Sequence, residues 1–333
     1  MMTDALKCLS KEAYALLEKA SLPDSVEPMK AILVDEPFSS PDWIFERKLD
    51  GERCLLQRRG KQVSLLSRNS TCKNTVYPEI ASHIEALPGD YILDCEIVTF
   101  SHQQTSFKKL QKRIHRRHPD ADLRRRIPVY GYVFDILHLD GFRLTGLPLR
   151  ERKKALKSFV GKSSLRYLRH RNERGRVFFR DACERGWEGL IAKKADSVYE
   201  QKRSRQWLKI KCSRQQEFVV AGFTDPTGKR EGFGALLIGY YEQDKLLYAG
   251  RVGTGFDDEF LAAFREDLDF AKRDTCPFEG YDGTRQGVHW VRPSFVAEIG
   301  FTEWTSSGRL RHPRFLGLRK DKEPASVRRE RAS

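Results

Sequence analysis

The fold of this chain is decided by the stretch Phe45-Glu46-Arg47-Lys48-Leu49-Asp50-Gly51-Glu52-Arg53. Apolar residues on both sides predict strands, and because residues two apart in a strand share a face, Glu46 and Lys48 are expected to point the same way. Asp50-Gly51 predicts a turn in which glycine lets two backbones approach closely. The pattern places an amine at the end of a strand, beside a carboxylate and a second cation. Taken alone, it also describes a salt-bridged surface strand followed by a hairpin turn.

The composition indicates a partner that is a polyanion. The 333 residues include 61 Lys and Arg against 46 Asp and Glu, a formal net charge of +15. Lys and Arg side chains that neutralise phosphates release counterions, and this release favours binding to nucleic acid. The charge alone fits an acidic membrane surface or simple solubility equally well. The length suits two or three domains.

Membrane insertion and secretion are not expected. No apolar run reaches the ~20 residues that a bilayer-spanning helix needs, and the N-terminus lacks a signal-peptide pattern. The 7 cysteines are scattered without a Cys-x-x-Cys pair, so neither a zinc ribbon nor a disulfide framework is expected. We interpret them as reduced thiols of a cytoplasmic protein.

Two later strands carry charged residues at period two, and a third strand between them carries a candidate aromatic residue. Asp94 and Glu96 share a face of the strand 91–98, where two carboxylates repel each other unless a metal or a cation lies between them. Phe134 lies in a buried strand, 129–137. Lys209 and Lys211 share a face of a period-two stretch that ends at residue 211, and their repulsion would be relieved by an anion such as a phosphate.

Three helical segments are predicted outside this pattern. Apolar residues at helical spacing over 6–20 predict one short amphipathic helix. The segment 107–126 holds nine cations, which favours contact with a DNA backbone over a merely solvated face. The helix 147–159 carries Arg152 and Lys153 and is expected on the exterior.

The composition changes after residue 211. Period-two strands at 217–223, 235–241, 245–252 and 295–301, with a helix at 256–271, suggest a small Greek-key barrel of the OB type. Residues beyond Pro324 are expected to form a frayed basic tail.

The spelling Lys-x-Asp-Gly-x-Arg at Lys48 resembles the nucleotidyl-lysine motif of ATP-dependent DNA ligases and of their relatives, RNA ligases and mRNA capping enzymes. Further segments resemble the later motifs of this family in the same order: Ser67-Arg68-Asn69, Asp94-Cys95-Glu96, Glu188-Gly189 followed by Lys193, Lys209-Ile210-Lys211, and Arg319-Lys320-Asp321-Lys322. Cys95 replaces the usual glycine and is expected to point away from the pocket. The resemblance covers roughly residues 25 to 324 and looks closest to bacterial repair ligases such as the ligase module of ligase D and the stand-alone ligase C.

The resemblance implies an α+β chain, with an ATP-grasp-like nucleotidyltransferase (adenylation) domain over 1–213 and an all-β OB-fold barrel over 214–333. It implies sealing of nicked double-stranded DNA through a lysyl-AMP and a DNA-adenylate. The catalytic residues would be Lys48, Asp50, Arg53, Lys209 and Lys211. Nucleotide-binding residues would be Glu46, Arg68, Glu96, Phe134 (stacked on the purine), Lys193, Arg203, Arg319 and Lys322. Glu96 and Glu188 are hard oxygen ligands that suit Mg²⁺ or Mn²⁺ better than zinc.

Because Arg319 belongs to the second domain, closure is expected for adenylation and reopening for DNA. A monomer at the bacterial nucleoid, with a Ku-like end-binding protein as a possible partner, is the expected setting. An RNA ligase or a GTP-using capping enzyme is the main alternative, and a basic OB-fold module with an inactive nucleotidyl site is a further one. The absence of zinc-type cysteines argues against an NAD⁺-dependent ligase.

Overall fold

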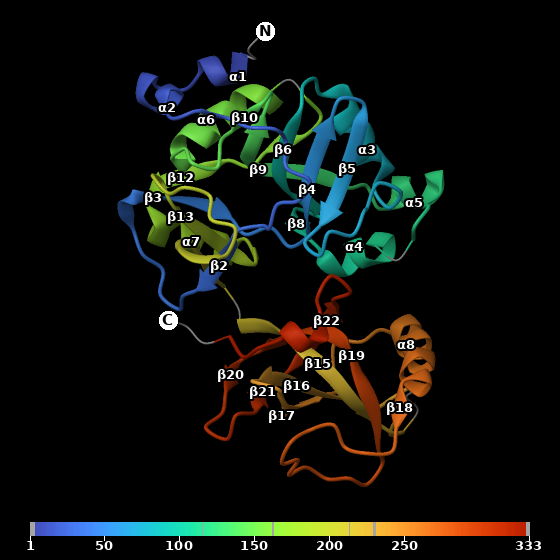
Figure 1. Cartoon of the computed structure of the whole chain (residues 1–333). Coiled ribbons are helices and arrows are strands. Elements are labelled where there is room, and N and C mark those ends of the chain that lie inside the picture. The colour runs from blue at the N-terminus through green and yellow to red at the C-terminus, as the bar shows by residue number, and fades with distance from the viewer. Residues whose placement is uncertain (1–3, 115, 162, 213, 229–230, 331–333) are drawn as a thin grey trace. The chain divides into compact units, whose positions relative to one another are not determined.

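The computed structural model describes residues 4–330 except 115, 162, 213, 229 and 230. Contacts divide the chain into two compact units, Met1–Cys212 and Ser213–Arg331, each of which is described by itself (Figure 1). The predicted domain limits fall next to this division, and residue 213 itself lies outside the described residues.

The first unit is built on two sheets. The larger sheet has seven strands in the order β1-β10-β9-β6-β4-β5, with β11 paired to β9. Its strands are β1 Glu18–Lys19, β4 Glu52–Arg59, β5 Gln62–Ser67, β6 Tyr91–Val98, β9 Tyr130–Leu139, β10 Phe142–Arg143 and β11 Arg166–Tyr167. The five-stranded sheet has the order β12-β3-β13-β14-β2. Its strands are β2 Lys30–Leu33, β3 Ser40–Arg47, β12 His170–Glu173, β13 Gly189–Lys194 and β14 Arg203–Lys211. A small hairpin is formed by β7 Phe100–Ser101 and β8 Gln104–Thr105.

Helices cover the outer faces of these sheets. The helices are α1 Asp4–Lys7, α2 Lys11–Ala15, α3 Pro78–Ala86, α4 Phe107–Ile114, α5 Ala121–Arg126, α6 Leu149–Val160 and α7 Gly175–Glu184. Helices α3, α4 and α6 pack on the larger sheet over one apolar cluster, while α7 packs on β3 and β13 over another. A third cluster joins the inner faces of the two sheets and includes Leu55, Phe134 and Trp207. The functional pocket described below opens beside this inner cluster.

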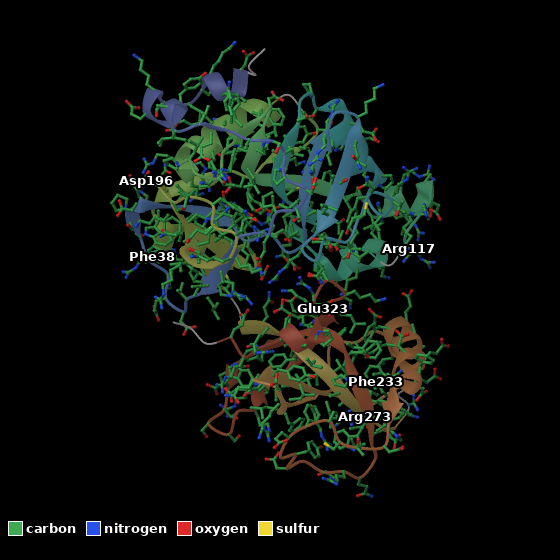
Figure 2. All side chains as sticks on the ribbon, in the orientation of Figure 1. Phe38, Arg117, Asp196, Phe233, Arg273 and Glu323 are labelled. Carbon is green, nitrogen blue, oxygen red and sulfur yellow. A yellow bond between two sulfur atoms is a disulfide. The ribbon has the colours of Figure 1, made fainter. Side chains whose placement is uncertain are left out.

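The second unit confirms the OB-type barrel. Its six-stranded sheet has the order β17-β16-β15-β19-β18, with β22 paired to β19. Its elements are β15 Arg214–Thr224, β16 Leu236–Glu242, β17 Lys245–Val252, α8 Asp258–Phe270, β18 Lys272–Arg273, β19 Val288–Phe301, β20 Glu303–Trp304, β21 Leu310–Arg311, β22 Arg314–Leu318 and the short 3-10 helix η1 Pro324–Ser326. Asp257 caps α8 by accepting the N–H of Phe260. Phe233, labelled in Figure 2, packs edge-on against Phe264 of this helix and fastens it to the barrel.

Two helix predictions are wrong in their details. The N-terminal helix is interrupted, because Ser10 accepts the N–H of Ala13 and starts a second helix while its own N–H donates to Glu151. Helix α6 is not exterior as a whole, since Arg152 and Lys153 are fully buried. Their side chains point inward, where Arg152 pairs with the buried Asp135 and Lys153 pairs with the buried Glu46.

The predicted basic surface at 107–126 is also corrected at one position. Arg113 is completely buried, where it pairs with Glu79 and donates to the carbonyl oxygens of Val76 and Ile127. It therefore holds α4 to α3 and is not available to DNA. Arg117, labelled in Figure 2, is exposed, and its predicted contact with a DNA backbone stays a prediction.

The expectation that every cysteine is a reduced thiol is wrong for one pair. Cys183 at the end of α7 and Cys212 after β14 form a disulfide across 29 residues. Sequence spacing gave no sign of it, because the two residues meet only through the pairing of β13 with β14.

The C-terminal tail is also more ordered than expected. Val327 is buried, its carbonyl accepts the N–H of Tyr241, and Gln216 bonds the backbone of Arg328 and Glu330. The tail is therefore part of the barrel as far as residue 330. Among the described residues, no helix has the length and apolar character needed to cross a membrane.

Candidate active site

One pocket lies between the two sheets of the first unit, with about 560 Å³ of empty space including its open mouth. The pocket is lined by Ala31, Glu46, Arg47, Lys48, Leu49, Arg53, Glu96, Phe134, Leu168, Ile191, Lys193 and Trp207. Eight of the predicted site residues do not line the pocket: Asp50, Arg68, Glu188, Arg203, Lys209, Lys211, Arg319 and Lys322.

Lys48 is fixed at the pocket by its backbone and by its side chain. Its N–H donates to the carbonyl of Gly189 at 2.9 Å, and its ammonium pairs with the carboxylate of Glu188. Glu188 lies just before β13, outside the strand. Gly189 is required here, because its φ is +149° and a Cβ would lie 2.0 Å from the carbonyl oxygen of Ile210.

The turn after Lys48 depends on a second close approach. A Cβ on Gly51 would lie 2.3 Å from the carbonyl oxygen of Ile97, so only glycine lets β4 begin this close to the end of β6. Asp50 does not line the pocket. Its Oδ2 accepts the N–H of Phe107 at 2.9 Å, and its own N–H donates to Thr105 Oγ1 at 3.1 Å. In the structure Asp50 thus anchors the loop to the first residue of α4.

Arg53 is the cation that the two carboxylates of β6 require. Its Nε and Nη2 reach Asp94 at 2.8 and 2.5 Å, and Nη1 donates to the carbonyl of Met29 at 2.7 Å. Although burial opposes it, the charge of Asp94 raises the pKa of the Arg53 guanidinium. Glu96 lines the pocket, while Cys95 points into the opposite core, as expected.

The inner end of the pocket combines aromatic rings with a buried ion pair. Lys193 Nζ lies 4.3 Å from the ring centroid of Phe134 and 4.0 Å from that of Trp207. Its charge is balanced by Glu46 Oε2 at 2.7 Å, and Lys153 contacts Glu46 Oε1 at 2.5 Å. Burial would raise the pKa of Glu46, but the two ammonium groups outweigh it and hold that pKa below its usual range.

Sequence reasoning missed Trp207 and Lys153 as site residues. Trp207 could have been found, because it shares the period-two face of Lys209 and Lys211 on β14. Lys153 carried no such signal, since it is 107 residues away from Glu46 in the chain.

The paired lysines of β14 are aligned with Glu46 and Lys48 by strand register. Lys209 is opposite Ile191, which is opposite Glu46 on β3. Lys211 is opposite Gly189, whose carbonyl receives the N–H of Lys48. The two lysines do not line the pocket itself but lie on the strand face that continues from Trp207.

Four predicted residues lie elsewhere. Arg68 is in the turn after β5, and the exposed Arg203 donates to the carbonyl of Ala31 at 2.8 Å. Arg319 and Lys322 belong to the second unit. Arg319 pairs with Asp321 at 2.8 Å and Glu298 at 3.0 Å, and Lys322 pairs with Glu217 at 2.8 Å.

The carboxylates of Glu96 and Glu188 fit a divalent ion whose remaining ligands would be phosphate oxygens of the substrate. Glu96 lines the pocket and Glu188 contacts its lysine, so both carboxylates belong to the same site. Within the described residues, no three His, Cys, Asp or Glu side chains gather to hold a metal by themselves. One or two carboxylates completed by substrate oxygens and water is the arrangement typical of Mg²⁺.

A two-sheet unit with this pocket, followed by an OB barrel, is the architecture of a nucleotidyltransferase. Residues 23–211 match the family model "ATP dependent DNA ligase domain", and residues 229–322 match "ATP dependent DNA ligase C terminal region". The chain belongs to the ATP-dependent DNA ligase family.

Its relatives include the multifunctional non-homologous end joining protein LigD of Pseudomonas aeruginosa, 34% identical over 94% of this chain, and LigD of Mycobacterium tuberculosis, 36% identical over 88%. The chain spans 38% of the length of each of these relatives. A solved structure of mycobacterial DNA ligase D complexed with ATP and MES is 33% identical, with a TM-score of 0.69 over 93% of this chain and 100% of that one.

Proposed function

We propose that the chain is an ATP-dependent DNA ligase that seals nicks between a 5′-phosphate and a 3′-hydroxyl. The observation that carries this proposal is the position of Lys48, whose ammonium pairs with Glu188 at a pocket with an aromatic inner end. The family membership supports the same reaction.

Three transfers make up the proposed reaction. The Lys48 amine attacks the α-phosphorus of ATP, pyrophosphate leaves, and AMP is held through a P–N bond. The 5′-phosphate of the nick then takes AMP from Lys48. Finally the 3′-hydroxyl attacks that phosphate, AMP leaves, and the strand is continuous. Arg53, Lys209 and Lys211 favour the neutral form of the attacking amine and balance the charge that develops on the phosphate oxygens.

The inner end of the pocket suits a purine base. Phe134 supplies a ring for stacking, and Glu46 supplies a carboxylate acceptor whose ionised form is secured by Lys153 and Lys193. Adenine and guanine both carry an exocyclic amine that could complement this carboxylate, so the proposed use of ATP rather than GTP rests on the family membership.

Mg²⁺ or Mn²⁺ would be held by Glu96 and Glu188 and would supply a Lewis acid for the phosphate oxygens. Asp50, Arg68 and Arg203 stay proposed contributors to the reaction or to nucleotide binding. Arg319 and Lys322 would reach the phosphates by closure of the second unit, which requires them to exchange their carboxylate partners for phosphate oxygens.

End joining is the proposed setting, since LigD proteins are end-joining enzymes by name and this chain resembles their ligase region. The proposed substrate is nicked double-stranded DNA, joined by a monomer at the bacterial nucleoid in the cytoplasm, with a Ku-like protein as the proposed recruiting partner.

The direct test is labelling with radioactive ATP and Mg²⁺, followed by a chase with nicked DNA. The wild type is expected to take up AMP and lose it to DNA, while Lys48→Ala takes up none and the exposed control Lys154→Ala behaves as the wild type. Sealing assays on nicked DNA and on nicked RNA, run side by side, test the RNA-ligase alternative. Labelling with GTP in place of ATP tests the capping-enzyme alternative. Mass spectrometry that finds the adduct on another residue would overturn the role of Lys48.

A further inference from the structure

An exposed arginine lies on the pocket face of the larger sheet, outside the pocket walls. Tyr132 of β9 is directly opposite Glu96 of β6, which lines the pocket, and on its other side it is directly opposite Arg166 of β11. Residues that are directly opposite in neighbouring strands project from the same face of a sheet. Arg166 is therefore on the face of Glu96, and two strand spacings separate their backbones by about 10 Å.

Three aromatic side chains surround this position. Tyr130 and Tyr132 are two residues apart on β9, so they continue the face on which Phe134 lines the pocket. The Phe100 ring lies 5.7 Å from the ring of Tyr130 and 6.3 Å from that of Tyr132, measured between centroids. All three side chains pack against the inner cluster and remain only half-buried. We call Phe100, Tyr130 and Tyr132 the aromatic platform.

The platform fixes the arginine in place. The guanidinium carbon of Arg166 lies 3.9 Å from the centroid of the Tyr130 ring, and its Nη1 donates to the hydroxyl of Tyr132 at 3.0 Å. Among the residues that the structure describes, Arg166 has no carboxylate partner. A second cation adjoins the platform, since Lys109 Nζ donates to the carbonyl of Phe100 at 3.0 Å.

This setting suits a phosphate. Tyr130 covers one face of the guanidinium and Tyr132 takes one N–H, which leaves other N–H groups of the exposed Arg166 in the guanidinium plane. Such a planar fork matches phosphate oxygens, and because the tyrosines already hold it, little side-chain freedom is lost on binding.

The position favours a DNA phosphate over the phosphates of ATP. Phe134 is the proposed stacking ring for the base, and four strand residues separate it from Tyr130, a span of about 13 Å. Arg166 is not a wall of the pocket, so a substrate that reaches it has to extend beyond the nucleotide. Aromatic side chains interleaved with cations are typical of surfaces that track a nucleic-acid strand.

We propose that Arg166, held by Tyr130 and Tyr132, binds one phosphate of the DNA strand beside the nick, and that the platform contacts the sugars next to that phosphate. This inference rests on the proposed ligase function and identifies a DNA-binding surface that adjoins its active site.

The test uses the full chain with Arg166→Gln, Arg166→Lys and Tyr132→Phe. The matched control is Arg180→Gln, an exposed cation on α7, which packs on the opposite face of the five-stranded sheet. Fluorescence anisotropy without Mg²⁺ measures the binding of a pre-adenylated nicked duplex over a range of salt concentrations. AMP labelling over a range of ATP concentrations is measured on the same proteins.

We expect Arg166→Gln to weaken binding of the nick by about tenfold, the cost of a charged hydrogen bond, and by more than any loss in AMP labelling. The salt dependence, as the slope of log affinity against log salt, should become shallower by about one. Arg166→Lys should keep the slope and recover part of the affinity. Tyr132→Phe should also keep the slope, because it removes only the hydroxyl that orients the charge. Arg180→Gln should stay within about twofold in both measurements.

Neutral methylphosphonates, placed singly at each phosphate around the nick, locate the contact. At one position the neutral linkage should weaken the wild type by about as much as Arg166→Gln does, and should not weaken Arg166→Gln further.

Three results would be decisive in the other direction. Unchanged affinity and slope in Arg166→Gln, or the absence of any such position, would overturn the proposal. A larger loss in the ATP dependence of labelling than in nick binding would overturn it by assigning Arg166 to the nucleotide. A wild type that binds the nick through Arg166 but never labels with AMP would overturn the ligase function and leave the DNA-binding surface standing.

Discussion

Replacing Lys153 with methionine tests whether the buried ion pairs set the stability of the first unit. Lys153 lies on α6, where Nζ contacts Glu46 Oε1 at 2.5 Å and donates to the carbonyl of Leu168 at 3.0 Å. Lys153→Met keeps the apolar stem but removes one of the two ammonium groups that balance Glu46. Breaking a buried pair from one side costs about 3–5 kcal/mol, because the remaining charge is desolvated without compensation.

The pH dependence of this loss has a definite sign. The folded-state pKa of Glu46 is lowered from 4.5, so its stabilising contribution is present above pH 4.5 and is lost as pH falls through the folded pKa. Lys153→Met raises that pKa, because burial is then opposed by Lys193 alone. The difference between wild type and variant should therefore be largest near neutral pH and shrink below pH 4.5.

Urea unfolding at several pH values measures this difference. The matched control is Lys154→Met, on the next residue of the same helix, where the ammonium pairs with Glu151 at 2.6 Å and the side chain is 52% exposed. This surface pair should be worth less than about 1 kcal/mol. Equal losses for the two variants, or a Lys153→Met loss that grows in acid, would refute the reasoning.

Three further variants test other parts of the fold. Gly189→Ala should lower AMP labelling about 100-fold, because the new Cβ would lie 2.0 Å from the carbonyl oxygen of Ile210. Relief of that clash would shift the carbonyl of residue 189, which accepts the N–H of Lys48. Unchanged labelling would refute the steric argument. Burial lowers the pKa of His170 from 6.5 to about 4, so between these pH values the unfolded state binds more protons than the folded state. Urea unfolding should therefore show the free energy of unfolding falling by about 2–3 kcal/mol as the pH drops from 6.5 to 4. His170→Gln should remove this pH dependence, and a dependence that survives the substitution would assign the effect to another group. Cys183→Ser should cost about 3–4 kcal/mol of unfolding free energy in oxidised protein, and equal losses in dithiothreitol would show that the disulfide is not the cause.

The local features of the site were predictable from the sequence because they depend on short-range geometry. Strand alternation placed Cys95 in the core and Glu96 in the pocket, and it aligned Lys209 with Lys211. The turn at Gly51 was also predicted, since close backbone approach is a property of the glycine itself. The resemblance of the motifs indicated the family, and the comparisons confirm that membership.

The partners of the charged residues were not predictable in this way. Helix α6 was expected on the exterior because its cations follow one another in the sequence, yet Arg152 pairs with the buried Asp135 and Lys153 with Glu46. These carboxylates come from strands of different sheets, and no local pattern connects them to the helix. The disulfide of Cys183 escaped prediction for the same reason, since its partner arrives through a strand pairing.

The same principle applies to the two proposed site cations of the second unit, Arg319 and Lys322. Glu217 on β15 and Glu298 on β19 are directly opposite each other, and like charges in that position repel. Lys322 and Arg319 relieve the repulsion, so both cations are already balanced within the barrel. A phosphate that recruits them has to compete with carboxylates, and the net gain is the difference between two ion pairs rather than the full strength of one.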